Sequence, residues 1–332
     1  MHELTVGQND AGQRLDKFLS KALPDLPKSL LYKSVRTKKI KVNRRRAEIG
    51  QLLAAGDTLQ LFLSDEFFGR TEDPVPMLAS LRPNIKVLYE DENILLLNKP
   101  SGVSVHEDTL NRTNNLLVHM QAYLYQKGEY DPRSEQSFAP ALCNRIDRNT
   151  AGIVIAAKNA EALRVMNEKI RGREIDKGYL LAVHGAPSPG EATLSAFLVR
   201  YEDEKRVRVF DREPKEGGLR ILTKYKTLAT EGGLSLLYVE LLTGRTHQIR
   251  AHMAHIGHPL LGDGKYGISE KDRARGYSHQ ALVSFRLTFS FRGEGTVLDY
   301  LNGKTVSLSP EEVPFLREFP HFDSASLARY GG

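Results

Sequence analysis

The chain has 332 residues, of which 40% are hydrophobic and 27% are charged. This is the composition of a folded globular protein, and it excludes a chain that is disordered throughout. The single cysteine, Cys143, excludes an internal disulfide framework, a multi-thiolate metal site and an iron–sulfur cluster. No apolar run has the length of a transmembrane helix, and the N-terminus lacks the pattern of a signal peptide. We therefore expect a cytoplasmic protein that does not engage a membrane.

The net charge of +6 originates in one short segment. Residues 28–46 carry nine basic side chains and no acidic one, which leaves 38 basic residues against 41 acidic ones in the rest of the chain. Apolar residues are interleaved with these charges, so we expect the segment to be folded with its charges on one surface. Such a surface is typical of proteins that bind a polyanion, above all a nucleic acid. A solvated basic face without a partner is the alternative.

The first 64 residues are predicted to form a small module. Apolar residues at helical spacing predict helices at residues 14–23 and 29–37. Alternating segments at residues 40–43 and 57–63 predict two strands. Residues 65–84 are acidic and contain prolines, and we expect them to link this module to the rest of the chain.

Strand patterns dominate from residue 85 onward, and one helix is predicted at residues 159–171 with Asn159 as its N-cap. Strands are predicted at residues 85–90, 93–99, 152–158, 178–185, 206–210, 221–228, 234–242 and 281–291. Because strands and helices do not alternate regularly, we predict an α+β fold. Residues 85–332 would form a large domain with a mixed, largely antiparallel sheet and helices and loops around a central cleft. Residues 1–64 would form a small α/β module.

Asp147 is the first candidate for a chemical role. It lies between Arg145 and Arg148, directly before a turn and the apolar strand predicted at residues 152–158. Two guanidinium groups favour the charged form of a carboxylate, so we expect an anion that is suited to nucleophilic or electrostatic work. A structural salt bridge at the start of a strand is the alternative, and the spacing alone favours it.

Residues 241–263 form the second candidate. We predict a strand that ends near Arg245 and a helix that begins at Thr246, with His247 and Arg250 on the same helical face. Backbone N–H groups and two arginines at such a corner are suited to binding a phosphate or a buried carboxylate.

Histidines at positions 247, 252, 255 and 258 raise the question of a zinc site. Helical spacing would allow only neighbouring pairs of them to reach one ion, and the stretch contains no thiolate or glutamate. We therefore expect ordinary polar and packing roles, and no metal. The glycines form no phosphate loop or dinucleotide fingerprint, so no nucleotide cofactor is expected. Cys143 has no base near it in the sequence and is interpreted as an ordinary buried cysteine.

Four motifs together resemble a known family. They are NKPSGVSVH at residues 98–106, NRIDRNTAGIVIAAK at 144–158, DKGYLLAVHG at 176–185 and LLTGRTHQIRAHMAHIGHPLLGDGKYG at 241–267. In their order and spacing they are similar to the bacterial pseudouridine synthases that act on ribosomal and transfer RNA. The basic module resembles the small RNA-binding domain that is named after a ribosomal small-subunit protein. The resemblance implies an isomerase that acts on uridines of large-subunit ribosomal RNA, with transfer RNA as the alternative.

The resemblance also implies roles for individual residues. Asp147 would be the catalytic group, Arg250 its ion-pair partner, Tyr179 the residue that stacks on the target base, and Arg145 a contact to the substrate backbone. The full predicted set of substrate-binding residues is Arg145, Arg148, Arg245, His247, Lys38, Lys39, Arg44, Arg45 and Arg46.

The sequence departs from the family pattern at five positions. Asn144 replaces a histidine, Ile146 a leucine and Ala151 a serine, and Lys39 and Arg44 stand where glycine is common. None of these departures removes a group with an assigned chemical role. Because of them, the target uridine of better-known family members is not assigned to this protein.

Pseudouridine formation is a redox-neutral isomerisation, so the resemblance implies no cofactor and no metal. RNA is the expected partner, and a monomer is the default. A non-catalytic RNA-binding or ribosome-assembly factor on the same fold is the main alternative. A hydrolase of N-glycosidic bonds is a weaker one, because the motif holds one carboxylate where glycosidases normally use two.

Overall fold

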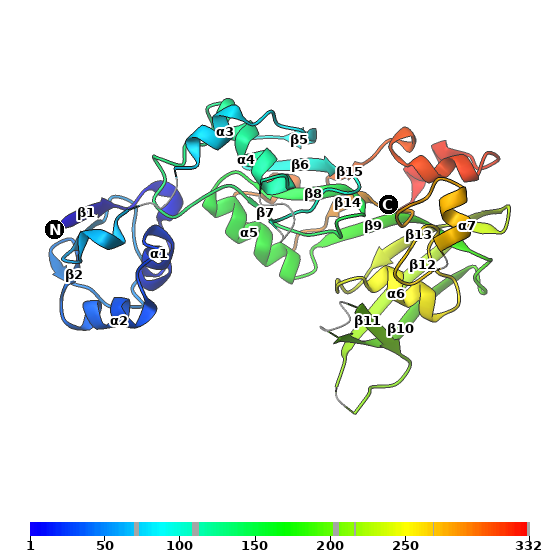
Figure 1. Ribbon diagram of the computed structural model, residues 1–332, viewed down its shortest axis with the longest axis horizontal. Helices are drawn as coiled ribbons and strands as arrows, with labels where there is room; N and C mark the ends of the chain where they lie inside the picture. The colour runs from blue at the N-terminus through cyan, green and yellow to red at the C-terminus, as the bar shows by residue number, and fades with distance from the viewer. Residues whose placement is uncertain (70–72, 108–112, 202–205, 216, 268, 331–332) are drawn as a thin grey trace.

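The protein is described by a computed structural model (Figure 1). The structure describes residues 1–69, 73–107, 113–201, 206–215, 217–267 and 269–330. The chain forms a four-stranded sheet near its N-terminus and an 11-stranded sheet beyond it. Among the described strands of the large sheet, β8 and β14 pair in parallel and the other neighbours pair antiparallel. The predicted α+β class with a mixed, largely antiparallel sheet is confirmed.

The small module forms at the end of the molecule where the chain begins (Figure 1). Its sheet has the order β1-β4-β2-β3, and two helices cover it. The elements are β1 (His2–Thr5), α1 (Leu15–Ala22), α2 (Lys28–Arg36), β2 (Ile40–Val42), β3 (Arg45–Arg46) and β4 (Thr58–Leu61). Both predicted helices and both predicted strands are present. Strand β1 was not predicted, because four residues are too few to show a pattern and their pairing with β4 creates the strand.

The described residues between the two domains, 65–69 and 73–84, include two short helical elements. They contain the 3-10 helix η2 (Asp65–Phe67) and the helix α3 (Val75–Ser80). Val75 and Leu78 are buried, and Gln126 of α4 (Leu116–Gln126) donates a hydrogen bond of 2.8 Å to the Leu78 carbonyl. The segment therefore packs against the large domain. The division into 1–64, 65–84 and 85–332 stays a prediction.

The small module also contacts the large domain directly. Asp10 is buried, and its Oδ1 accepts hydrogen bonds from the Ser137 hydroxyl at 2.5 Å and the Ser137 amide at 3.2 Å. The side chain of Asn9 accepts a bond of 3.2 Å from the amide of Ala160, the first residue of α5 (Ala160–Arg171). Arg164 of the same helix donates to a carbonyl of the module. These polar contacts dock the module onto one end of α5.

The large sheet has the order β11-β10-β12-β13-β9-β14-β8-β6-β5, with β15 beside β14 and β7 beside β8. Its strands are β5 (Lys86–Glu90), β6 (Ile94–Lys99), β7 (Ala141–Leu142), β8 (Ala151–Ala157), β9 (Ile175–His184), β10 (Glu191–Tyr201), β11 (Arg206–Phe210), β12 (Leu219–Glu231), β13 (Leu234–Leu241), β14 (Leu282–Phe289) and β15 (Thr305–Ser307). The two remaining helices are α6 (Gln248–His255) and α7 (Ser269–Ala274). Within the described chain, no helix has the length and apolar character needed to cross a bilayer.

Helices cover both faces of the large sheet. On one face, α4 packs on β6 and β8 through Leu116 and Met120, and α6 packs on β9 and β13 through Ile249 and Met253. On the other face, Met166 of α5 joins the core that includes the C-terminal 3-10 turns. Burial on both faces explains why β6 and β8 read as continuous apolar runs. Helix α4 and strand β10 were not predicted.

Strand β14 is buried on both faces, although its sequence pattern suggests one exposed face. Strict alternation at residues 281–291 indicates a strand with one solvated face, yet Ser284 and Arg286 are only 1% and 6% exposed. Arg286 donates to the Leu327 and Ala328 carbonyls, each at 3.1 Å, in the last 3-10 turn, η6 (Ser324–Arg329). The C-terminal turns therefore cover Arg286, whereas Ser284 packs against β8, where its hydroxyl donates to the Ile153 carbonyl at 3.3 Å.

The parallel contact between β8 and β14 depends on Gly152. Its φ is +114°, and a Cβ atom at this position would lie 2.2 Å from the Ser284 carbonyl oxygen. Ser284 is in turn the register partner of Tyr179 on β9. The close approach at Gly152 thus brings the turn that carries Asp147 alongside Tyr179.

We predict that Gly152→Ala destabilises the fold, because the methyl group collides with backbone and the residue must keep a positive φ. The melting temperature should fall by at least about 5 °C in a thermal unfolding experiment. Gly190→Ala is the matched control, since its Cβ would meet Thr227 Cβ at 4.0 Å. Equal melting temperatures for the two variants would contradict this account of the β8–β14 contact.

Candidate active site

A cleft of about 370 Å³ lies against the face of the sheet that α6 covers. Residues from three separate sequence motifs line it: Asp147 from the turn before β8, Tyr179 from β9, and Arg245, His247 and Arg250 from the start of α6. Arg145 also lines the cleft, and its side chain is exposed at the rim. The fold therefore brings the predicted catalytic residues together although they lie far apart in the chain.

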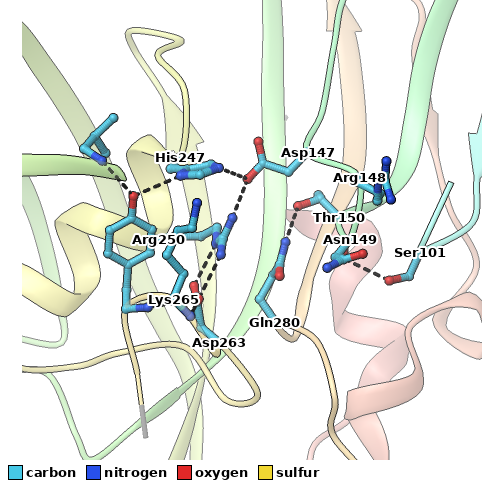
Figure 2. A network of polar contacts seen from close by, with 12 residues as sticks. Ser101, Asp147, Arg148, Asn149, Thr150, His247, Arg250, Asp263, Lys265 and Gln280 are labelled. Atoms are coloured by element: carbon cyan, nitrogen blue, oxygen red, sulfur yellow. Dashed lines mark hydrogen bonds and ion pairs between the residues drawn. The ribbon is translucent and has the colours of Figure 1, made fainter. Parts of the chain in front are cut away.

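The Asp147 carboxylate is held through one of its two oxygens. Its Oδ2 accepts a hydrogen bond of 2.9 Å from Nη1 of Arg250 and lies 3.8 Å from Nε2 of His247 (Figure 2). No described residue donates to Oδ1, and the side chain is 25% exposed. The ion-pair partner is thus Arg250, 103 residues further along the chain, whereas the flanking Arg145 and Arg148 make no contact with the carboxylate in the described structure.

Arg250 is shared between two carboxylates. Its Nε and Nη2 donate to the two oxygens of Asp263 at 2.7 and 2.8 Å, and Asp263 is 0% exposed. Burial by itself would raise the pKa of Asp263, but the hydrogen bonds and charge of Arg250 outweigh it and hold that pKa below its ordinary value. Burial likewise opposes the charge of Arg250, and Asp263 and Asp147 together raise its pKa. Both carboxylates therefore meet a permanently charged guanidinium.

The turn after Asp263 supports the same site. The amides of Lys265 and Tyr266 donate to Asp263 Oδ1 at 2.9 and 3.2 Å. The Tyr266 hydroxyl lies 2.9 Å from Nδ1 of His247, and its ring lies under Arg250 at 5.3 Å. Burial lowers the pKa of His247, although Asp147 opposes the shift, so the imidazole is neutral at neutral pH. The sequence analysis missed Asp263 and Tyr266, although both lie inside the motif at 241–267.

Lys99 is a second residue that the sequence analysis missed. Its side chain is 0% exposed, and Nζ donates to the carbonyls of Pro100, Val103 and Arg148 at 2.9, 2.7 and 2.8 Å. Burial lowers the pKa of Lys99 to about 7, whereas three carbonyl acceptors match the three N–H donors of the ammonium form. Because one of these carbonyls belongs to the residue after Asp147, Lys99 ties the loop at residues 99–103 to the Asp147 turn.

Other side chains hold the same turn in place. Ser101 donates to the Asn149 carbonyl at 2.9 Å, and Gln280 donates to the Thr150 hydroxyl at 3.2 Å (Figure 2). The buried Asn144 accepts a bond of 2.7 Å from the amide of Ile155 on β8. The departure from histidine at position 144 thus leaves a side chain that anchors the turn to the sheet.

Tyr179 forms an aromatic wall of the cleft. It is 6% exposed, and burial raises its pKa to about 12, so it remains a phenol at neutral pH. Burial also raises the pKa of Cys143, which lines the same cleft, to about 12. A protonated thiol is a poor nucleophile, in agreement with the sequence interpretation of Cys143.

Helix α6 begins later than predicted. Thr246 is not its N-cap. That position belongs to His247, whose φ is +54°, and the helix starts at Gln248. The Gln248 side chain accepts from the Arg245 amide at 3.1 Å and from the Thr243 hydroxyl at 3.0 Å. The Gln248 side chain therefore accepts the hydrogen bonds of the turn before the helix. The left-handed backbone of His247 directs its side chain toward Asp147.

The remaining histidines of this stretch have separate partners. His252 lies 3.0 Å from the Thr223 hydroxyl, His255 pairs with Asp211 at 2.8 Å, and His258 contacts a backbone carbonyl. Within the described part of the chain, no three His, Cys, Asp or Glu side chains are grouped so that they could hold a metal ion.

The predicted basic residues of the small module lie outside the cleft. Lys38, Lys39, Arg44, Arg45 and Arg46 are all exposed, around the β2–β3 hairpin. Arg44 has a φ of +64°, a conformation that favours glycine and fits the glycine common at this position in the family. The module lies at one end of the molecule and α6 in the other half (Figure 1). The cleft and the basic surface of the small module are therefore two separate surfaces of the protein.

Some of the module's exposed basic side chains line a groove. It lies between α2 and β3 and is lined by Tyr32, Lys33, Arg36 and Arg46, among other residues. Tyr32 is 49% exposed. An exposed aromatic ring among cations is typical of surfaces that contact nucleic acids.

Comparison with known proteins identifies the family. Residues 93–255 match the model of the RNA pseudouridylate synthase family. The ribosomal large subunit pseudouridine synthase C of Escherichia coli (strain K12) is 32% identical over 306 residues, which cover 89% of this chain and 90% of that protein. An RNA pseudouridine synthase of Mycoplasma pneumoniae is 32% identical over 283 residues, which cover 83% and 85%.

A solved structure has the same fold. The human RNA pseudouridylate synthase domain containing 1 aligns with a TM-score of 0.52 at 24% identity, over 71% of this chain and 95% of that one. The chain belongs to the RNA pseudouridylate synthase family, and the predicted resemblance is confirmed. It is accordingly an isomerase whose partner is RNA.

We predict that Arg250→Ala lowers the free energy of unfolding by about 3–5 kcal/mol at neutral pH, because it leaves the buried Asp263 charge without a partner. Adding Asp263→Asn to this variant should recover part of the loss, since it removes the unpaired charge. Denaturant unfolding of the wild type and of the single and double variants measures both effects.

The free energy of unfolding of the wild type and of Arg250→Ala should depend differently on pH. In the wild type, the lowered pKa of Asp263 adds stability above the unfolded-state pKa of about 4, and this stability is lost as the pH falls. Without Arg250, burial raises the pKa of Asp263, so the penalty grows as the pH rises above about 4. The stability gap between wild type and Arg250→Ala should therefore be larger at neutral pH than near pH 4. A gap that is constant over this range would contradict the role given to Asp263.

Proposed function

We propose that this protein converts specific uridines of large-subunit ribosomal RNA to pseudouridine, with Asp147 as the catalytic group. One observation carries the proposal: the Asp147 carboxylate lines the cleft with Oδ2 bonded to Arg250 and with Oδ1 bonded to no donor among the residues that the structure describes. The ribosomal target is supported by the relatives of Escherichia coli and Salmonella typhimurium, which are named as ribosomal large subunit enzymes. Transfer RNA is the alternative substrate. We also propose that the protein is a monomer and that it acts in the cytoplasm.

The reaction breaks the bond between ribose C1′ and uracil N1 and forms a bond between C1′ and C5. Positive charge develops at C1′ as N1 leaves, and an adjacent carboxylate can stabilise or trap it. Asp147 would serve as this carboxylate, and the hydrogen bond from Arg250 would hold it in position. Once the ring has rotated and C5 has bonded to C1′, the C5 proton is lost and N1 gains a proton, so the overall step is an isomerisation.

Tyr179 would hold the detached base. Its ring lines the cleft, and its raised pKa keeps the hydroxyl protonated at neutral pH. Stacking of a base on an aromatic ring is worth about 1–3 kcal/mol. Such contact would limit escape of the uracil while it rotates.

The RNA would be bound at two places. The target uridine must leave any helix to enter the cleft, because its reacting atoms are inaccessible in a duplex. Arg145 and Arg245 line the cleft and Arg148 follows Asp147, so these side chains could hold the phosphates around the flipped nucleotide. His247 would contribute a polar contact there. The basic module would bind a second segment of the same RNA.

Asp147→Asn tests the catalytic assignment. We expect the rate of pseudouridine formation to fall more than about 10⁴-fold, because loss of a reacting group removes most of the catalysis. Affinity for the RNA should stay within a few-fold of wild type. Asp131→Asn, in a turn remote from the cleft, is the control and should retain full activity. Retention of more than one percent of the rate by Asp147→Asn would contradict the assignment, and release of free uracil would instead indicate a hydrolase.

A charge-neutralised variant tests the basic module. Replacing Lys38, Lys39, Arg44, Arg45 and Arg46 by glutamine should weaken RNA binding. The negative slope of log affinity against log salt should become shallower by roughly 3, because fewer counterions are released. The rate at saturating RNA should change less than the affinity. Lys271→Gln combined with Arg273→Gln on α7 is the control. An unchanged slope would mean that the module does not contact phosphates.

A further inference from the structure

The turn at residues 263–266 contacts both groups that flank Asp147. It lies beyond residues 93–255, the region that the family model matches. Its first residue, Asp263, binds Arg250, and its last residue, Tyr266, binds His247. We propose that Asp263 and Tyr266 are positioning residues that direct both Arg250 and His247 to Oδ2 of Asp147 and so leave Oδ1 as the reacting oxygen. This inference rests on the proposed role of Asp147.

Asp263 determines where Arg250 points. Two of the three guanidinium nitrogens bond to the two Asp263 oxygens at 2.7 and 2.8 Å, and such a bidentate pair fixes the plane of the guanidinium. The third nitrogen, Nη1, is thereby aimed at Asp147 Oδ2 at 2.9 Å. Asp263 is fully buried and accepts further bonds from the Lys265 and Tyr266 amides, so its own position is firmly held.

Tyr266 determines which nitrogen of His247 carries the proton. The amide of Val207 donates to the Tyr266 oxygen at 3.1 Å, which leaves the hydroxyl proton to be donated to His247 Nδ1 at 2.9 Å. An imidazole that accepts at Nδ1 carries its proton on Nε2 when it is neutral. That N–H faces Asp147 Oδ2 at 3.8 Å, beside the oxygen's bond to Arg250.

The Arg250 and His247 side chains both face the same oxygen of Asp147, Oδ2. Figure 2 shows the contacts of Arg250 and His247 meeting at the same oxygen of Asp147, with the other oxygen turned away from both. The hydrogen bond from Arg250 Nη1 lowers the nucleophilicity of Oδ2 relative to Oδ1. That bond, together with the His247 ring 3.8 Å from the same oxygen, restricts rotation of the carboxylate. A misplacement of about 1 Å in such a group can cost about 100-fold in rate. Neither Asp263 nor Tyr266 lines the cleft, so the turn would orient Asp147 rather than bind the substrate.

Tyr266→Phe and Asp263→Asn test the inference in single-turnover reactions with transcribed large-subunit ribosomal RNA and excess enzyme. Tyr266→Phe keeps the ring against Arg250 and removes only the hydroxyl. We expect each variant to reduce the rate constant about 10- to 100-fold. The enzyme concentration for half-maximal rate should remain within about twofold of wild type, because neither residue is expected to bind RNA. Tyr277→Phe, which removes a hydroxyl that bonds to Glu318, is the matched control and should react like wild type.

A second measurement separates positioning from general structural support. Tyr266→Phe should have no further effect in a His247→Gln background, because the hydroxyl acts through His247. An equal loss in both backgrounds would show a structural role and overturn the inference. Should Asp263→Asn not yield folded protein, the Tyr266→Phe comparison is sufficient on its own.

Failure of this inference is distinguishable from failure of the proposed function. Wild-type rates for folded Tyr266→Phe and Asp263→Asn, together with an inactive Asp147→Asn, would overturn the positioning role and leave the proposed function intact. An active Asp147→Asn would overturn the proposed role of Asp147 itself.

Discussion

The central constraint of this structure is that one guanidinium must serve two carboxylates. Asp263 has no exposure to solvent and Asp147 is one quarter exposed, and Arg250 bonds to both. A charge in the interior requires a partner of opposite sign, so the buried pair anchors the arginine and the arginine in turn orients the exposed carboxylate. The stability of the fold therefore depends on this side chain, and so would the chemistry proposed for Asp147.

The placement of Asp147 also depends on the backbone of the sheet. The turn that carries it enters β8, which can run beside β14 only because Gly152 has no side chain at the point of contact. Hydrogen bonds from Lys99, Ser101 and Gln280 then hold the turn from three directions. A rigid turn of this kind positions a reacting group with little loss of conformational freedom on substrate binding.

The small module adds a second surface at a distance from this centre. Its exposed cations surround the β2–β3 hairpin, and contacts from Asn9 and Asp10 dock the module on α5 and on the segment that contains Ser137. In this arrangement an RNA that occupies both surfaces must span the length of α5. The docking would therefore contribute to which uridine reaches the cleft.

Local sequence determined the elements of the fold and the identity of the family. Apolar periodicity marked α1, α2, α5 and most strands of the large sheet, since these patterns depend on neighbours a few residues apart. The four motifs indicated the pseudouridine synthase family, and that resemblance predicted roles for Asp147, Tyr179 and Arg250. Short or uniformly apolar segments such as β1 and α4 carry no such periodicity, so they were missed.

Tertiary structure decided what each charge pairs with and which faces are buried. The spacing of residues placed Asp147 between Arg145 and Arg148, and only the family resemblance implied Arg250 as its partner. In the structure the hydrogen bond to Asp147 comes from Arg250, because pairing depends on distance in space and the turn directs the carboxylate toward α6. The roles of Lys99, Asp263 and Tyr266 likewise arise from contacts between distant segments. Arg286 on β14 is buried because the C-terminal segment covers it, whereas Ser284 is buried against β8. Such long-range contacts leave no periodic pattern in the chain, and only the folded arrangement reveals them.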